Sequence, residues 1–249
     1  MTQRVKGMLL TLAAISILFV GLNSVAEAGL FGFGGDSWQE EVLLHDGQKM
    51  IVERSQTYGG RHEVGQPSPI KEHTITFTVP SSSTRFIWTS RYGKELGRTN
   101  FLLLAVHVLN GIPYLVVQPN LCLSYNKWGR PNPPYVFFTY EGNAWQRIPL
   151  EAVPAEFTTL NVAISLDTRY VRDMVARRVV PAEIIKERNG QLTQPEFKML
   201  LREPVKSGRG GASLVDCEER IRVKDGWISP GGSKAPSPLM PPGPIDATK

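Results

Sequence analysis

Short stretches in which apolar and polar residues alternate, separated by turn sequences, constrain the fold of this chain more than any other feature. The clearest is residues 74–79, where isoleucine, phenylalanine and valine share one face and threonines occupy the other. Asp46-Gly47 and Asn110-Gly111 each follow such a stretch, and both dipeptides supply the positive φ angles that tight hairpin turns require. We therefore expect an antiparallel sheet assembled from hairpins.

About eight stretches of this kind are expected as strands. They are residues 38–44, 49–57, 74–79, 85–90, 101–109, 112–118, 135–140 and 144–148. Their hairpin connections predict a mainly β fold, an antiparallel meander that forms a sandwich or a barrel. Periodicity alone does not assign the apolar run 101–109, but the Asn-Gly that follows it favours a buried hairpin over a helix.

The pattern changes after residues 38–165, which we assign to one antiparallel β domain. Residues 166–206 are expected to form a small helical segment packed on it. Asp167 is a candidate N-cap for a helix that runs to Arg178, and Pro181 is suited to the first turn of a second helix. The sequence Thr-Gln-Pro-Glu at residues 193–196 has the form of a capping box and predicts a third helix through Leu201.

Glycine, serine and proline dominate the segments on either side of this folded region. Residues 29–37 are expected to be a flexible spacer, because four of the first seven residues are glycine. Residues 207–228 form a tail segment that contains Cys217, and part of it can dock as a strand. The composition of residues 229–249 predicts disorder.

Residues 1–28 have the three parts of a secretory signal peptide. Arg4 and Lys6 precede an apolar run, and the sequence Ala-Glu-Ala at residues 26–28 is the small-x-small pattern that signal peptidase reads. We therefore expect cleavage after Ala28, a periplasmic or secreted protein, and no transmembrane segment after cleavage. The alternative is an uncleaved N-terminal helix that tethers the protein to a membrane.

Charge and composition bear on possible partners. The chain has a formal net charge of +5, and no run of Lys or Arg exceeds two consecutive residues. Because no nucleic-acid-binding motif accompanies this mild basic balance, we expect no nucleic-acid partner. Outside the cytoplasm, a basic surface favours contact with anionic glycans, lipid head groups or acidic proteins, or simply keeps the protein soluble.

Cys122 and Cys217 are the two cysteines of the chain. In an oxidising compartment such a pair is a candidate disulfide, and closing so long a loop would remove about 4 to 5 kcal/mol of unfolded-state entropy. Two alternatives stay open, namely two buried free thiols, or Cys122 as a nucleophile served by a histidine.

Motifs of known catalytic mechanism are missing from the sequence, which contains no G-x-S-x-G, phosphate-binding loop, H-E-x-x-H or C-x-x-C. His62 adjoins Glu63 and His73 adjoins Glu72, but neighbouring residues of a strand point to opposite faces and are poorly placed to share a metal ion. We expect no metal and no cofactor. The same pairs are the candidate acid, base and histidine of an alternative function, a hydrolase that acts on envelope polymers.

The most unusual segment is residues 125–135, in which three prolines and a glycine separate aromatic, amide and cationic side chains. A rigid loop loses little entropy on binding, and these groups suit a glycan or an acidic peptide. The candidate binding residues are Tyr125, Lys127, Trp128, Arg130, Asn132 and Tyr135. The alternative is a structural loop in which Trp128 covers the end of the core.

Four runs of sequence carry a resemblance. They are YGGRHEVGQ, NKWGRPNPPYVFF, AWQRIPLEAVPAEF and LTQPEF. They are similar to runs in an uncharacterised family of small exported proteobacterial proteins with a domain of unknown function, over most of the chain from Trp38 to Pro204. The resemblance implies a Gram-negative envelope location and a single domain, and it supplies no catalytic residues.

Taken together, these features favour an exported, non-enzymatic module that binds an unknown envelope glycan or protein partner through the rigid loop of residues 125–135. The hydrolase is the alternative from another class. An open groove holding two carboxylates about 5 to 9.5 Å apart would favour the hydrolase.

Overall fold

The computed structural model describes residues 35–80, 82–164, 166, 168–208, 213–224 and 226–230. The expected signal peptide, most of the expected spacer, the N-cap Asp167 and nearly all of the expected disordered tail lie outside these residues.

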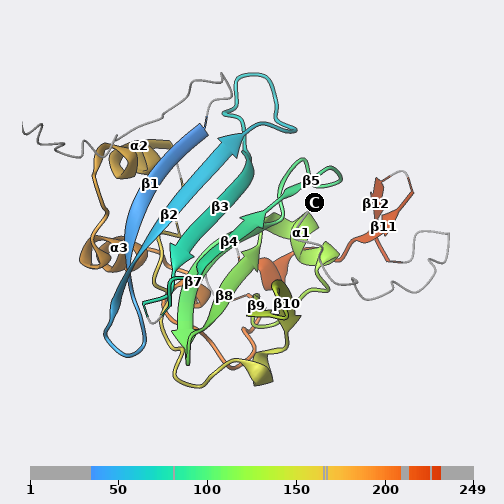
Figure 1. Ribbon diagram of the computed structural model, residues 1–249. Helices are drawn as coiled ribbons and strands as arrows, with labels where there is room; N and C mark the ends of the chain where they lie inside the picture. The colour runs from blue at the N-terminus through green and yellow to red at the C-terminus, as the bar shows by residue number, and fades with distance from the viewer. Residues whose placement is uncertain are drawn as a thin grey trace, which may run out of the picture.

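Two four-stranded antiparallel sheets make up most of the fold (Figure 1). Sheet I has the order β1-β2-β3-β4, with strands β1 (Gly35–Leu43), β2 (Lys49–Tyr58), β3 (Ile70–Thr78) and β4 (Arg85–Ser90). Sheet II has the order β10-β9-β8-β7, with strands β7 (Phe101–Leu109), β8 (Ile112–Pro119), β9 (Val136–Glu141) and β10 (Ala144–Ile148). Each sheet is a meander, so the predicted fold class is confirmed.

Local turn chemistry explains these hairpins. Gly47, Asn110 and Gly111 have positive φ angles of 84°, 51° and 77°, as the Asp-Gly and Asn-Gly turns predict. The turn between β9 and β10 has the same character, with φ angles of 58° at Gly142 and 67° at Asn143. The expected strand pairs are therefore present.

A core of apolar side chains fills the space between the two sheets. In β3, Ile75 and Phe77 are buried while the threonines between them face outward, as the alternation predicts. Leu103 and Leu115 meet them from sheet II. The amide of Asn161 donates to the carbonyls of Leu43 (3.0 Å) and Val106 (2.8 Å), which ties the β1 and β7 edges of the two sheets together.

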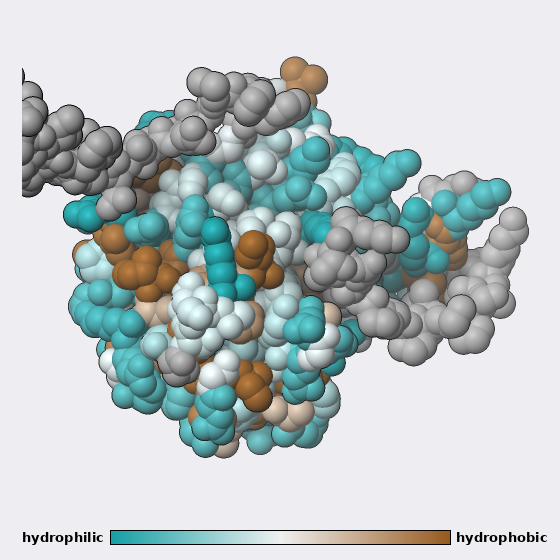
Figure 2. All heavy atoms as spheres, viewed as in Figure 1, coloured by the Kyte–Doolittle hydropathy of each residue, from teal (hydrophilic) through white to brown (hydrophobic). Residues whose placement is uncertain are grey.

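Sheet II is buried on both faces, which explains the continuous apolar run in β7. The register shifts between Leu103 and Ala105, so Leu104 and Ala105 face away from the sandwich core. There they pack against Phe157 and Leu200 from the segments that follow β10. The outer face of sheet I is largely polar, and Figure 2 shows hydrophilic side chains with separate apolar ones between them.

Two helices lie beside β1, namely α2 (Thr168–Ala176) and α3 (Ala182–Asn189) (Figure 1). Their buried residues Val171, Met174 and Ile185 pack on Trp38 of β1. Residues 180–182 also hydrogen-bond to the edge of β1, since the Val180 amide donates to the Gln39 carbonyl at 2.9 Å. The helical segment thus covers one edge of the sandwich.

Three expectations about local structure were wrong. β1 begins at Gly35, so the spacer expected to end at residue 37 is shorter; a Cβ at Gly35 would meet the Gln56 carbonyl oxygen at 2.7 Å. The third helix is only the 3-10 turn Pro195–Phe197. Residues 121–127, part of which we assigned to a rigid loop, form the helix α1 (Leu121–Lys127).

The remaining elements are short. They are the β5–β6 pair (Tyr92–Gly93 and Arg98–Thr99), the 3-10 turns Leu150–Ala152 and Leu214–Asp216, and the β11–β12 hairpin (Ile221–Val223 and Gly226–Ile228). The hairpin projects from the body of the molecule next to α1 (Figure 1). None of the helices in the described ranges is long and apolar enough to cross a membrane.

Candidate functional site

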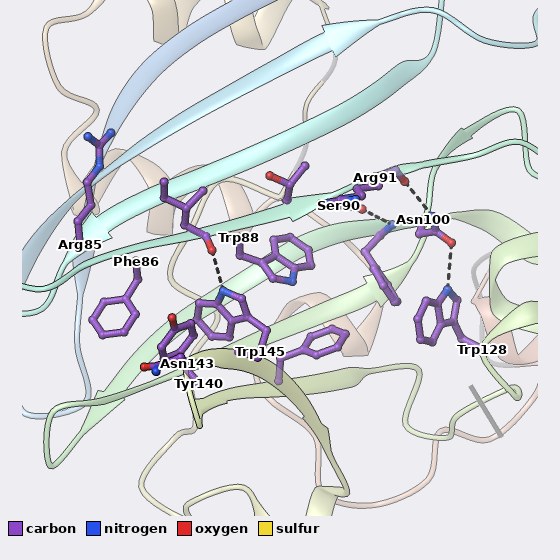
Figure 3. Close-up of a pocket in the computed structure, with 15 residues that line it drawn as sticks. Arg85, Phe86, Trp88, Ser90, Arg91, Asn100, Trp128, Tyr140, Asn143 and Trp145 are labelled. Atoms are coloured by element: carbon purple, nitrogen blue, oxygen red, sulfur yellow. Dashed lines mark hydrogen bonds between the residues drawn. The ribbon is translucent and has the colours of Figure 1, made fainter. Parts of the chain in front are cut away.

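An aromatic cleft opens between the two sheets where the edge strands β4 and β10 face each other (Figure 3). Its volume is about 410 Å³. Seven aromatic side chains line it, namely Phe86, Trp88, Phe101, Trp128, Phe138, Tyr140 and Trp145. We refer to this space, defined by these residues, as the aromatic cleft.

Strand alternation places these rings on the inner face of each sheet. Phe86 and Trp88 are two residues apart in β4, as are Phe138 and Tyr140 in β9, so each pair points the same way. The rings make edge and tilted contacts, including Phe86 with Tyr140 (centroids 5.0 Å apart). Such contacts add to the stability that burial provides.

Trp145 closes the side of the sandwich at which the cleft lies. Its indole Nε1 donates to the carbonyl oxygen of Ile87 in β4 at 2.7 Å, so one side chain bridges the two edge strands (Figure 3). On the opposite side the segment around Asn161 does the same for β1 and β7. Because β4 and β10 are not paired as strands, this hydrogen bond and the ring contacts of Phe86 and Trp88 join the two sheets on this side.

Asn100 organises the other end of the cleft. Its Oδ1 accepts hydrogen bonds from Lys127 Nζ (2.7 Å) and Trp128 Nε1 (3.3 Å), and its Nδ2 donates to the Arg91 carbonyl (2.8 Å) (Figure 3). The Trp128 ring packs on Phe101, with centroids 4.4 Å apart. The loop that contains Trp128 therefore forms one wall of the cleft.

The aromatic residues of the predicted binding loop are not exposed. Tyr125 and Tyr135 are 2% exposed and Trp128 is 7% exposed. The Tyr135 hydroxyl donates to the Glu196 carbonyl at 2.8 Å, and burial raises its pKa. This corrects the expectation of an exposed recognition surface, because the apolar area of these rings is used to close the core.

The polar residues of the same loop also bond within the protein. Lys127 forms an ion pair with Glu95 (2.6 Å), and Asn132 exchanges hydrogen bonds with the backbone of Val205. Arg130 lies over the Tyr125 ring and donates to the Cys217 carbonyl at 2.8 Å. Arg130, Asn132 and Tyr135 thus join this loop to segments after residue 195, whereas Lys127 and Trp128 bond Asn100 at the cleft.

The predicted disulfide between Cys122 and Cys217 is present, with Cα atoms 5.4 Å apart. Asn126 supports the same junction, since its Nδ2 donates to the Glu218 carbonyl and its Oδ1 accepts from the Arg220 amide. The bond fastens the tail segment to α1, which excludes free thiols and a Cys122 nucleophile in this state.

The histidine and carboxylate pairs of the hydrolase hypothesis do not come together. His62 and Glu63 are exposed in the β2–β3 loop. His73 is buried inside the sandwich, whereas Glu72 is on the outer face of β3 and accepts from the Tyr92 amide. Within the described ranges no group of three or more His, Cys, Asp or Glu residues could hold a metal ion.

A buried ion pair lies between β1 and β2, away from the cleft. Arg54 Nη1 donates to Glu40 Oε1 (2.9 Å) and to the Ala163 carbonyl (2.8 Å), and both side chains are almost fully buried. Glu40 also accepts from the Trp38 indole and from the Ala163 amide. The pair therefore clamps the segment that leads to α2 onto sheet I.

Two histidines are buried in their neutral form. Burial, aided by the nearby positive charge of Arg54, lowers the pKa of His73 to about 3. Burial likewise lowers the pKa of His107 to about 4, with a smaller contribution from His45. Each donates from Nε2 to a backbone carbonyl, that of Phe101 or Thr159, so both are structural neutral imidazoles.

Comparison with known protein families, with curated proteins and with solved structures finds no match to this chain. The resemblance to an exported family is thus still an expectation from the sequence runs alone.

Proposed function

We propose that this protein is an exported, non-enzymatic β-sandwich module that binds an apolar group of an envelope partner in the aromatic cleft. Export rests on the sequence of residues 1–28, which has the form of a signal peptide. The binding role rests on the cleft, which is the observation that carries the proposal.

The cleft has the composition of a ligand site. Its volume of about 410 Å³ falls within the range of small-molecule pockets, which are lined mainly by apolar and aromatic side chains with a few polar groups. Trp88, Trp128 and Trp145 are each at most 7% exposed. Rings so deeply placed favour an inserted apolar group over a sugar stacked on an open aromatic face.

A neutral fluorescent probe tests this function directly. N-phenylnaphthylamine, whose emission rises in apolar surroundings, should bind saturably to the purified protein. Tyr140→Trp adds bulk where Tyr140 is only partly buried at the cleft, and it should weaken binding. Tyr114→Trp is the matched control, because Tyr114 is also partly buried but lies on the other face of sheet II.

Saturable probe binding that is lost in Tyr140→Trp and kept in Tyr114→Trp would support the proposal. Absence of saturable binding, or equal binding by both variants, would contradict it. Unfolding midpoints of the two variants should be measured alongside, since overpacking costs about 1 to 3 kcal/mol in either place.

A further inference from the structure

The polar groups in the buried wall of the aromatic cleft are engaged within the protein. The Asn100 amide bonds Lys127, Trp128 and the Arg91 carbonyl, as described above. Ser90 Oγ accepts from the Thr99 hydroxyl (2.6 Å) and from the Phe101 amide (2.8 Å). Because the Asn100 amide is engaged through both atoms and Ser90 Oγ already accepts two hydrogen bonds, this wall favours an apolar group between the sheets.

Arg147 is an exposed residue of β10 that lies beside the cleft-lining residues and, within the described ranges, forms no ion pair. It shares a face with Trp145 and lies opposite Phe138 in the strand register. Its guanidinium is 5.8 Å from the centre of the Trp128 ring. No described carboxylate pairs with it, whereas Lys127, the other cation near that ring, pairs with Glu95.

The environment of Arg147 favours an anion at this point. Burial lowers the pKa of its guanidinium, which means that the charge has lost part of its hydration. None of the residues that line the aromatic cleft is acidic, whereas the neighbouring hollow that Arg147 itself lines contains Glu151. A carboxylate placed on Arg147 would restore the lost interactions through charge-assisted, bidentate hydrogen bonds.

We propose that the aromatic cleft binds a single-chain anionic amphiphile of the fatty-acid class, with its hydrocarbon chain between the sheets and its carboxylate on Arg147. This inference rests on the proposed binding function and adds the chemistry of the ligand. The hydrocarbon chain of the ligand contacts the rings of Trp88, Phe138 and Trp145. The Trp128 ring lies between this hydrocarbon chain and the guanidinium of Arg147.

Calorimetric titration with decanoate and with decanol, which differ in the head group, tests the inference. Decanoate should bind more tightly than decanol. Arg147→Gln should weaken decanoate binding about tenfold, the loss expected for a hydrogen bond to a charged group, and leave decanol binding unchanged. Arg177→Gln is the matched control, because Arg177 is exposed, pairs with Asp173 in α2, and lies beside β1 at the other edge of sheet I.

The outcomes distinguish this inference from the proposed function on which it rests. If decanoate and decanol bind equally, or if Arg147→Gln and Arg177→Gln behave alike, the anionic ligand is refuted while the apolar cleft stands. If neither amphiphile nor the neutral probe binds saturably, the proposed function fails and the inference fails with it. Circular dichroism of Arg147→Gln checks that any loss of decanoate binding occurs in a folded protein. If that variant is unfolded, Arg147→Lys takes its place, since it keeps the charge but loses the bidentate hydrogen bonds.

Discussion

Acidification should unfold this protein through His73 and His107 before most of its carboxylates are protonated. Both imidazoles are buried, and their pKa values of about 3 and about 4 lie below the ordinary value of 6.5. Below pH 6.5 the unfolded chain therefore binds protons that the folded chain does not. Stability is complete above the unfolded pKa and falls as the pH drops toward the folded values.

The magnitude follows from the two shifts. Each unit of pKa difference corresponds to about 1.36 kcal/mol, so His73 accounts for about 5 kcal/mol and His107 for about 3 kcal/mol. Between pH 6 and pH 4 the two together should lower the free energy of unfolding by about 2.7 kcal/mol per pH unit. A typical domain is stable by about 5 to 15 kcal/mol, so this loss is enough to unfold a protein at the lower end of that range.

Urea denaturation followed by tryptophan fluorescence, repeated at several pH values from 7 to 4, measures this slope. His73→Phe and His107→Phe should each reduce it by about 1.4 kcal/mol per pH unit, whatever they do to stability at neutral pH. His62→Gln is the control, because His62 is exposed in a loop. Parallel slopes in the parent and both buried-site variants would refute the assignment of acid sensitivity to these histidines.

Four further predictions follow from the structure. Cys122→Ser should expose a free thiol at Cys217 to labelling and lower stability by about 2 to 4 kcal/mol, seen as a fall of several degrees in the thermal midpoint. Glu40→Ala should cost about 3 to 5 kcal/mol in urea unfolding because it leaves Arg54 buried and unpaired, and replacing both by Leu and Met should recover much of that loss. Trp128→Ala should cost about 3 to 5 kcal/mol by the same assay, whereas a loss of less than about 1 kcal/mol would restore the exposed-loop hypothesis. Amino-terminal sequencing of exported protein should begin at Gly29, and an intact residue 1 would favour the tether instead.

Strand positions could be predicted because alternation and turn chemistry are local. The eight expected strands are the strands of sheets I and II, with ends that shift by a few residues. The helix α1 could not be predicted this way. It has seven residues, too few to be stable alone, and it is held by the Cys122–Cys217 bond and by contacts of Asn126 with the tail. Long-range contacts of this kind leave no local pattern.

The approach of two edge strands from different sheets limits what the sequence can reveal about the site. The unusual loop marks Trp128 in the sequence, but proline and aromatic residues alone do not show which way a ring points, so the sequence allows both an exposed ring and a ring that covers the core. Trp145 and Asn100 drew no attention, since each is an ordinary residue in its own stretch. They matter because β10 comes to lie across from β4, a neighbour distant in sequence, and because Asn100 lies beneath Trp128.

The same arrangement makes Arg147 informative. Arg147 follows Trp145 by two residues in a strand, which is enough to predict that the two side chains share a face. A charged residue in an edge strand, however, is normally expected to face solvent. Only the approach of Trp128 from α1 gives the guanidinium an aromatic neighbour and removes part of its water. Arg147 is still exposed to water, and an anion bound beside the Trp128 ring would replace the part of its hydration that the guanidinium has lost.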